Sequence, residues 1–249
     1  MPERRPGGEP PANEGVCPIC KGSGYLRADV PYGHPFFGRL FPCECLEAAQ
    51  RERDFEDLQR FSNLGPFKDK TFDNFDGDVT GAAEAYKAAR EFAQNPLNRW
   101  LVLLGGCGCG KTHLAAAIAN AAVGQHIPSL FTVVPDLLDH LRATFGPAST
   151  IQYDELFEKV RATPLLVLDD LGTENATPWA EEKLYQILNY RYNERLPTVI
   201  TTNRELRSID ERIRSRMQDK ALVTLVSITA LDYRLREKGA RRQMRRRRA

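Results

Sequence analysis

The sequence contains no long apolar run and no recognisable signal peptide. No stretch of its 249 residues approaches the roughly 20 consecutive apolar residues that span a bilayer. Residues 1–15 carry four prolines and three glycines where a signal peptide would have its apolar segment, and they show no apolar periodicity. We therefore expect a cytoplasmic protein without a membrane partner, with a disordered segment at 1–15 and reduced cysteines.

The chain also lacks a large net charge, but its charge is unevenly distributed. The formal net charge is +2, from 35 basic and 33 acidic residues. Nine Lys or Arg residues and one acid lie between Arg234 and Ala249, so the rest of the chain is mildly acidic. A basic tail, here residues 239–249, is typical of an electrostatic arm for nucleic acid, and also of a solvated tail that only aids solubility. Both interpretations stay open.

A glycine-rich run, Gly105-Gly-Cys-Gly-Cys-Gly-Lys-Thr112, matches the phosphate-binding pattern G-x-x-x-x-G-K-[ST]. The apolar run 101–104 before it predicts a buried strand, and the Ala-rich run 112–122 after it predicts a helix. Backbone N–H groups of such a loop, with the helix N-terminus, form a nest for phosphate oxygens. The alternative is a glycine-rich turn without a ligand, which does not account for both flanks. We expect the nucleotide to contact Gly105, Gly106, Cys107, Gly108, Cys109, Gly110, Lys111, Thr112 and His113.

Strands and helices alternate from Trp100 onward. The pattern predicts further strands at 129–134, 165–168, 198–202 and 221–226, and helices at 135–143, 154–161, 178–194, 208–219 and from about 231. Before them, a charged helical connector at 46–61 and a helix at about 79–94 are expected. Repeated βα units of this length indicate an α/β fold with a parallel sheet and helices on both faces.

The polar residues at the predicted strand ends suggest one active site, because ligands of parallel sheets bind at the carboxyl ends of the strands. Lys111 can reach the outer phosphates, while Thr112 and Asp169 can hold Mg²⁺. Asp170 can orient and deprotonate the attacking water, and Asn203 can hold that water. The plainer interpretation is that these Asp and Asn residues only form turns.

Two arginines, Arg212 and Arg216, lie one turn apart in a predicted helix. An arginine supplied to the nucleotide of a neighbouring subunit stabilises the charge that develops on the transferred phosphoryl group. An exposed basic face without that role is the alternative.

Four of the six cysteines form two close pairs near the N-terminus. Cys17-Pro-Ile-Cys20 and Cys43-Glu-Cys45 are separated by 22 residues, a spacing that lets both pairs bind one tetrahedral ion. The segment is too small to bury a core, so a metal would hold it together. Unrelated buried cysteines or a redox pair are the alternatives. We predict a zinc module at 16–46, with His34 as a spare candidate ligand.

The order of several motifs resembles that of the AAA+ ATPases in the DnaC helicase-loader and IstB transposition-helper group. The motifs are the loop at 105–112, Asp169-Asp170, Thr201-Thr-Asn203, Ser215-Arg-Met217 and Asp232-Tyr-Arg234. The runs 71–75 and 189–198 are similar too, so the resemblance covers residues 65–238. N-terminal cysteine modules also occur among such loaders.

The resemblance implies a P-loop AAA+ three-layer fold at 65–238, preceded by the zinc module and a helical linker at 47–64. Little chain follows Val226, so the C-terminal lid is expected to be rudimentary. The implied roles are Walker B for Asp169 and Asp170, sensor 1 for Asn203, trans-acting finger for Arg216 and sensor 2 for Arg234. Many AAA+ enzymes carry Glu where this chain has Asp170, which leaves a nearly inactive ATP-dependent switch as an alternative.

The function implied is that of a DNA-replication accessory ATPase that uses ATP, Mg²⁺ and Zn²⁺. It would form homo-oligomers, bind single-stranded DNA between 134 and 165, and deliver a replicative helicase. A transposition helper, with a transposase as client, is the closest alternative. A P-loop small-molecule kinase or GTPase is a further one, although no Asn-Lys-x-Asp guanine-reading motif and no substrate lid are evident.

Overall fold

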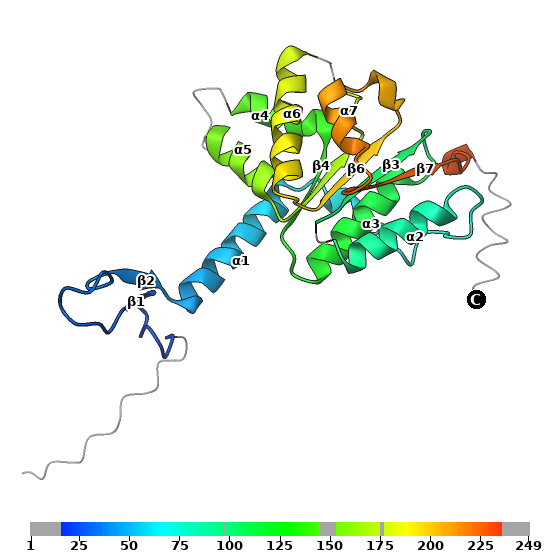
Figure 1. The fold of residues 1–249 in the computed structure, drawn as a ribbon. Coiled ribbons are helices and arrows are strands. Elements are labelled where there is room, and N and C mark those ends of the chain that lie inside the picture. Colours follow the sequence, from blue (N-terminus) through cyan, green and yellow to red (C-terminus); the bar gives the residue numbers. More distant parts are fainter. Residues whose placement is uncertain (1–15, 97, 145–152, 175–176, 236–249) are drawn as a thin grey trace, which may run out of the picture. The chain divides into compact units, whose positions relative to one another are not determined.

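Figure 1 shows the fold in the computed structural model, which describes residues 16–96, 98–144, 153–174 and 177–235. The chain divides into two compact units, Met1–Asp54 and Phe55–Ala249. The segment 1–15 and the basic tail at 239–249 lie outside the described residues. Within the described part, every helix is too short or too polar to pass through a lipid bilayer.

The described part of the first unit is a small hairpin followed by the first part of a helix, which continues into the second unit. Strands β1 (Tyr25–Arg27) and β2 (Leu40–Pro42) pair antiparallel, and helix α1 (Glu44–Phe61) follows. The sequence did not predict the strands, because three residues are too few to show an alternating pattern. Between residues 16 and 43 only Cys20 and Cys43 are buried, so this part of the unit has no apolar core.

The second unit contains a five-stranded parallel sheet in the order β4-β5-β6-β3-β7. The strands are β3 (Trp100–Gly105), β4 (Ser129–Val133), β5 (Leu165–Asp169), β6 (Thr198–Thr202) and β7 (Val223–Ile228). Strand β6 lies between β5 and β3, with Leu168 opposite Ile200 and Leu104 opposite Thr202. The predicted parallel sheet is confirmed.

Helices cover both faces of this sheet, which gives the three predicted layers (Figure 1). One face carries α2 (Ala83–Gln94) and α3 (Lys111–Gly124). The other carries α4 (Val134–Ala143), α5 (Tyr153–Ala162), α6 (Pro178–Asn193) and α7 (Glu211–Met217). In β3, Leu101 and Leu103 pack with the first helix layer, and Trp100 and Val102 with the second. A slip of one residue would exchange the two sets, so the layers fix the register.

Two helices begin later than predicted, for local reasons. Helix α2 starts at Ala83 because Gly81 adopts a left-handed φ of +84° and its carbonyl accepts the amide of Thr229. Helix α7 starts at Glu211 because the Asp210 carboxylate caps it, accepting the amides of Arg212 and Ile213.

The structure also contains three short 3-10 turns that the sequence did not predict: η1 (Gly65–Phe67), η2 (Leu206–Ser208) and η3 (Tyr233–Leu235). Strand β7 starts at Val223, two residues later than expected, and η3 is the only element that follows it among the described residues. The C-terminal lid is therefore rudimentary as far as the chain is described.

A buried arginine holds together the edge of the sheet where the strands begin. Arg191 is fully buried, and its guanidinium donates to Thr198 Oγ1 and to the carbonyls of Arg161, Thr163 and Pro197. No carboxylate pairs with it in the described part of the chain, and burial lowers its pKa to about 9. Arg191 thereby ties the ends of α5 and α6 to the start of β6.

Candidate functional site

Three strand ends bring the predicted phosphate and water ligands to one edge of the sheet. Strand β3 ends at Gly105, β5 at Asp169, and β6 at Thr202, one residue before Asn203. Strand β6 lies between β3 and β5 in the sheet. Asn203, directly after the end of β6, therefore lies between the glycine loop that follows β3 and the acidic pair at the end of β5. The edge therefore carries a cation, two carboxylates and an amide from segments far apart in sequence.

The loop between β3 and α3 needs glycine at two positions in particular. Gly110, the residue before α3, has a φ of +109°, and a Cβ there would lie 2.8 Å from a ring carbon of Phe75. Gly108 has a φ of +69°, and a Cβ there would lie 1.7 Å from Asp232 Oδ1. Side chains at either position would be strained and would collide with a neighbour. The loop backbone is therefore packed from both sides.

Lys111 places its ammonium group inside the loop. The side chain is buried, and Nζ donates to the carbonyl oxygens of Gly105 (3.0 Å) and Gly106 (2.8 Å). These bonds hold a positive charge among backbone N–H groups at the N-terminus of α3, where the helix dipole also favours an anion. The arrangement suits the oxygens of a polyphosphate.

A threonine that the sequence did not single out holds the first acid in place. Asp169 Oδ1 accepts hydrogen bonds from Thr201 Oγ1 (2.6 Å) and from Thr112 Oγ1 (3.2 Å). Burial raises the pKa of Asp169, whereas these two hydroxyls act to lower it. Thr112 and Asp169 thus present oxygen atoms together, the donor type that Mg²⁺ prefers. Thr201 begins the Thr201-Thr-Asn203 motif, but the sequence indicated a role for Asn203 alone.

The second acid has an unusual backbone conformation. Asp170 has a φ of +58°, in the left-handed region that Asp and Asn enter more readily than other residues with side chains. Its amide donates to Thr201 Oγ1, and its carbonyl accepts from Thr173. This geometry gives a local reason for Asp rather than the longer Glu at this position.

Asn203 and the loop contact each other directly. Asn203 Nδ2 donates to Cys107 Sγ over 3.8 Å, which places the amide at the outer side of the glycine loop. The exposed amide can therefore reach a group bound at that loop. The structure brings Lys111, Thr112, Asp169 and Asn203 together in the manner the strand-end argument predicted.

A cavity of about 530 Å³ lies beside the loop. Its walls include Phe75, Val79, His113 and Tyr233, together with the loop residues Gly108 to Gly110 and Thr112. No motif in the sequence assigned the wall at 67–82 to the site, although the run 71–75 lies within it. The volume and the mixed aromatic and polar lining suit a nucleoside attached to phosphates in the loop.

Two side chains of α3 hold this wall against the loop. His113 Nε2 contacts the carbonyl oxygen of Thr71 at 2.9 Å, and the ring packs edge-on against Phe75. Burial lowers the pKa of His113. Asn120 Nδ2 donates to the carbonyls of Phe67 and Lys70. His113, predicted as a nucleotide contact, does line the cavity, whereas Asn120 was not predicted.

The C-terminal segment closes another side of the cavity. The amide of Tyr233 donates to the carbonyl of Gly108 over 3.0 Å, and the amide of Arg234 donates to Asp232 Oδ1. Arg234, the sensor 2 candidate, lines the cavity with Tyr233. The segment therefore contacts the loop from the side opposite β6.

Arg216 contacts residues of its own chain outside this edge. Its guanidinium donates to Asn189 Oδ1 (2.5 Å), to the Tyr185 hydroxyl (3.4 Å) and to the carbonyl of Arg212. Arg212 forms ion pairs with Glu182 and with the capping Asp210. The structure thus places both arginines on the α6–α7 surface, and neither lines the cavity beside the loop.

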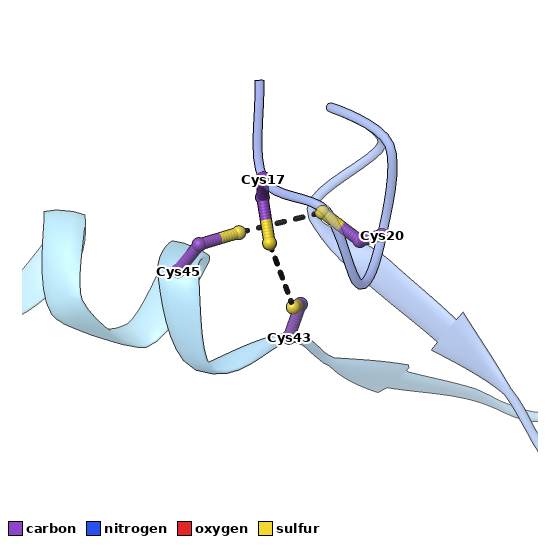
Figure 2. Close-up of side chains that lie close together, drawn as sticks. All are labelled: Cys17, Cys20, Cys43 and Cys45. Carbon is purple, nitrogen blue, oxygen red and sulfur yellow. Dashed lines mark hydrogen bonds between the residues drawn. The ribbon is translucent and has the colours of Figure 1, made fainter. Parts of the chain in front are cut away.

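The four predicted cysteines converge in the first unit (Figure 2). All four Sγ atoms lie within 4.8 Å of one another, with 3.8 Å between Cys17 and Cys43 and 3.4 Å between Cys20 and Cys45. Four thiolates about 2.3 Å from a tetrahedral zinc ion would be about 3.8 Å apart. The donor set therefore fits Zn²⁺, while His34 instead accepts the amide of Phe36 in the hairpin.

The ionisation of the thiols also suits a cation. Burial opposes ionisation of Cys20, but hydrogen bonds from Cys45, Gly24 and Gly22 outweigh it and bring the pKa of Cys20 to about 6. The bond that Cys45 makes to Cys20 raises the pKa of Cys45 to about 12. One charged sulfur thus opposes ionisation of the next, and a divalent cation would let all four ionise.

Comparison with known proteins agrees with this geometry. Replicative helicase loader DnaI of Bacillus subtilis is 32% identical over 115 residues, 46% of this chain and 36% of the relative. A putative ATP-binding protein of insertion sequence IS5376 from Geobacillus stearothermophilus is 26% identical over 212 residues, 82% of this chain and 81% of the relative. The crystal structure of the DnaC helicase loader superposes with a TM-score of 0.59 and 26% identity, covering 66% of this chain and 99% of that one.

The match to DnaI spans about a third of that relative's length, so it concerns a part of each protein rather than the whole. A much longer match comes from the sequence profile of the IstB-like ATP binding proteins, which covers residues 36–246. It includes the glycine loop, the acidic pair, Asn203, the α7 arginines and the C-terminal segment. On this match, together with the P-loop AAA+ fold, the chain belongs to the IstB-like ATP-binding family, to which DnaC-type and DnaI-type helicase loaders are similar.

Proposed function

We propose that this protein is an ATP-hydrolysing helicase loader that assembles into homo-oligomers, binds single-stranded DNA and delivers a replicative helicase. The observation that carries the proposal is the edge where Lys111, the Thr112–Asp169 pair and Asn203 meet, beside a cavity sized for a nucleoside. The similarity to DnaI and DnaC, whose names describe helicase loaders, supports the choice of client.

Each residue at this edge would have a separate role in ATP hydrolysis. Lys111 would bind the outer phosphates, and Mg²⁺, held by Thr112 and Asp169, would neutralise phosphate charge when bound. Asp170 would take the proton of the attacking water, which Asn203 would orient. Thr201 would keep Asp169 aimed at the site through its short hydrogen bond.

Arg216 would act on the nucleotide of a neighbouring subunit. Its contacts with Tyr185 and Asn189 hold the guanidinium on the α6–α7 surface of its own subunit. On this surface it can meet a second copy, and a planar guanidinium is suited to bridging phosphate oxygens. Hydrolysis would then depend on assembly.

A complementation assay tests both the site and the assembly. Lys111→Ala lacks the ammonium that would bind phosphate but keeps the arginine, and Arg216→Ala keeps that ammonium but lacks the arginine. Each variant alone should be nearly inactive, and a mixture should regain ATP turnover because some interfaces combine the two intact halves. Arg216→Lys, which keeps the charge without the planar fork, should behave like Arg216→Ala. A mixture as inactive as its parts, or full turnover by Arg216→Ala, would refute a finger at this position.

The client is tested separately by co-purification. Tagged chain should retain the replicative helicase in the presence of ATP. Retention of a transposase instead would favour the transposition helper, an alternative supported by the 26% identity to the IS5376 protein over 82% of this chain.

A further inference from the structure

The hairpin of the cysteine unit exposes an unusual density of aromatic rings. Tyr32 is 90% exposed, Phe36 44%, Phe37 42% and Phe41 39%. We call these four residues the ring face. Exposed rings gathered on so small a unit are typical of a binding surface, because apolar surface of this kind is otherwise covered.

The rings pack in two edge-to-face pairs. The centroids of Tyr32 and Phe37 are 5.4 Å apart at an interplanar angle of 77°, and those of Phe36 and Phe41 are 5.9 Å apart at 69°. When one ring directs its edge at another, its own flat faces are not covered by that partner. The pairing thus fixes the rings and covers at most one flat face in each pair, so that flat faces not covered by a neighbouring side chain are left for stacking.

Two arginines flank the same rings. The guanidinium carbon of Arg27 lies 5.3 Å from the Phe37 centroid, and that of Arg39 lies 5.7 Å from the Phe36 centroid. Neither arginine has a carboxylate partner in the part of the chain that the structure describes. Asp29 is the only acid in the sequence between Tyr25 and Pro42. Two positive charges therefore lie beside the ring face, and no acidic side chain among the described residues pairs with them.

We propose that the ring face binds single-stranded DNA, with unpaired bases stacked on the rings and phosphates bound by Arg27 and Arg39. Stacking needs bases whose flat sides are accessible, and those of a duplex are covered by their neighbours. An apolar protein partner would bury both guanidinium groups without supplying an acid, which is costly. A nucleic acid strand supplies an anion for each cation and a flat ring for each aromatic side chain.

This inference deepens the proposed DNA binding, because it assigns strand contacts to the cysteine unit in addition to the ATPase unit. It needs neither ATP nor a particular client. It can therefore be tested in the absence of nucleotide, and in a Lys111→Ala background in which the ATPase site cannot contribute nucleotide-dependent binding.

The test measures fluorescence anisotropy of a labelled 15-nucleotide oligo-dT with the full-length, zinc-loaded protein. Tyr32→Ala and Phe37→Ala should each weaken binding by about 5- to 100-fold, the range for loss of one stacked base, without changing the salt dependence. Arg27→Ala and Arg39→Ala should each reduce the slope of log K against log salt by about 0.7. The two kinds of contact thus have different signatures.

Leu40→Ala is the matched control, since Leu40 lies in the same hairpin, is 65% exposed and has no aromatic ring. Its affinity for the strand should equal that of the parent, and all variants should retain about one zinc per chain and unchanged ATP turnover. Parental affinity in both ring variants would overturn the proposal, as would equal losses for single-stranded and duplex DNA. Loss of helicase capture with strand binding intact would also overturn it, and would identify a protein-docking surface.

Discussion

The two units of this protein hold their functional residues in place by different means. At the nucleotide edge, Asp169 is positioned by Thr201 and Thr112, and behind them lies a sheet packed between two layers of helices. In the cysteine unit, residues 16–43 bury only two side chains, and both are cysteines. The nucleotide edge is therefore supported by a hydrophobic core that forms without it. Among residues 16–43 the cysteine cluster has no such core beside it, and its four side chains are the main contacts that hold the hairpin together.

The two units should therefore respond differently when a ligand is removed. Removing a ligand from the nucleotide edge should change chemistry and leave the fold intact, because the sheet does not depend on it. Removing a metal held by the four cysteines should unfold the hairpin, since the described residues 16–43 bury no other side chains. Four predictions, from the largest expected effect to the smallest, test this difference.

Replacing Cys17 and Cys20 by serine should remove zinc and unfold the hairpin. Structural zinc sites of this type contribute on the order of 10 kcal/mol to the fold that they hold. Metal analysis should find about one zinc per chain in the parent and none in the variant, and hydrogen exchange should show the loss of protection confined to residues before α1. The affinity for ATP should stay within about twofold, and a folded, metal-free hairpin would contradict the comparison.

Asp170→Asn should abolish hydrolysis while leaving both the fold and ATP binding unchanged. Asn enters the left-handed φ of this position as readily as Asp, but it cannot accept the proton of the attacking water. A lost general base costs about 100- to 10,000-fold in turnover. Phosphate release at saturating ATP measures the loss. Near-parental turnover would mean that Asp170 is not the base.

Lys111→Ala should weaken ATP binding by roughly 10- to 100-fold, as expected when one charge-assisted hydrogen bond to phosphate is removed. Titration with a fluorescent ATP analogue measures the affinity, and circular dichroism should show an unchanged fold. Lys70→Ala, at a lysine that lines the cavity but lies outside the loop, is the matched control and should bind the triphosphate far more tightly than Lys111→Ala. Equal affinities in the two variants would contradict the assignment of the phosphate site.

Asp169→Asn should increase the thermal stability of the metal-free protein at neutral pH. Burial raises the pKa of Asp169 in the fold, so the folded chain binds the proton more tightly than the unfolded chain does. The resulting destabilisation is absent below the ordinary pKa of Asp and grows as the pH rises toward the raised value. Melting temperatures in EDTA should therefore differ between parent and variant at pH 7 and converge near pH 4. A parent that is the more stable at pH 7 would contradict this.

Much of the ATPase unit could be read from the sequence because its signals are local. The strand before Gly105 is continuously apolar since both of its faces are buried, and the same holds for the strand before Asp169. Parallel strands place their carboxyl ends at one edge, so Asn203 could be assigned to the site without a structure. The convergence of the four cysteines could be predicted because the spacing of two close pairs is itself the signal.

The sequence did not reveal residues whose role depends on contacts with segments distant in sequence. Thr201 and Asn120 act through hydrogen bonds to Asp169 and to the 67–70 segment, which no periodicity encodes. The late start of α2 depends on the contact between Gly81 and Thr229, 148 residues apart by their numbers. The hairpin of the cysteine unit has strands of only three residues and no buried side chain other than Cys20 between residues 16 and 42, so no hydrophobic pattern marked it in the sequence.

The position of Arg191 gives the run 189–198 a structural role. That guanidinium joins three chain segments at the edge of the sheet remote from the glycine loop, and Asn189 beside it anchors Arg216. The run 189–198 therefore contributes to the packing of this edge rather than to the phosphate site.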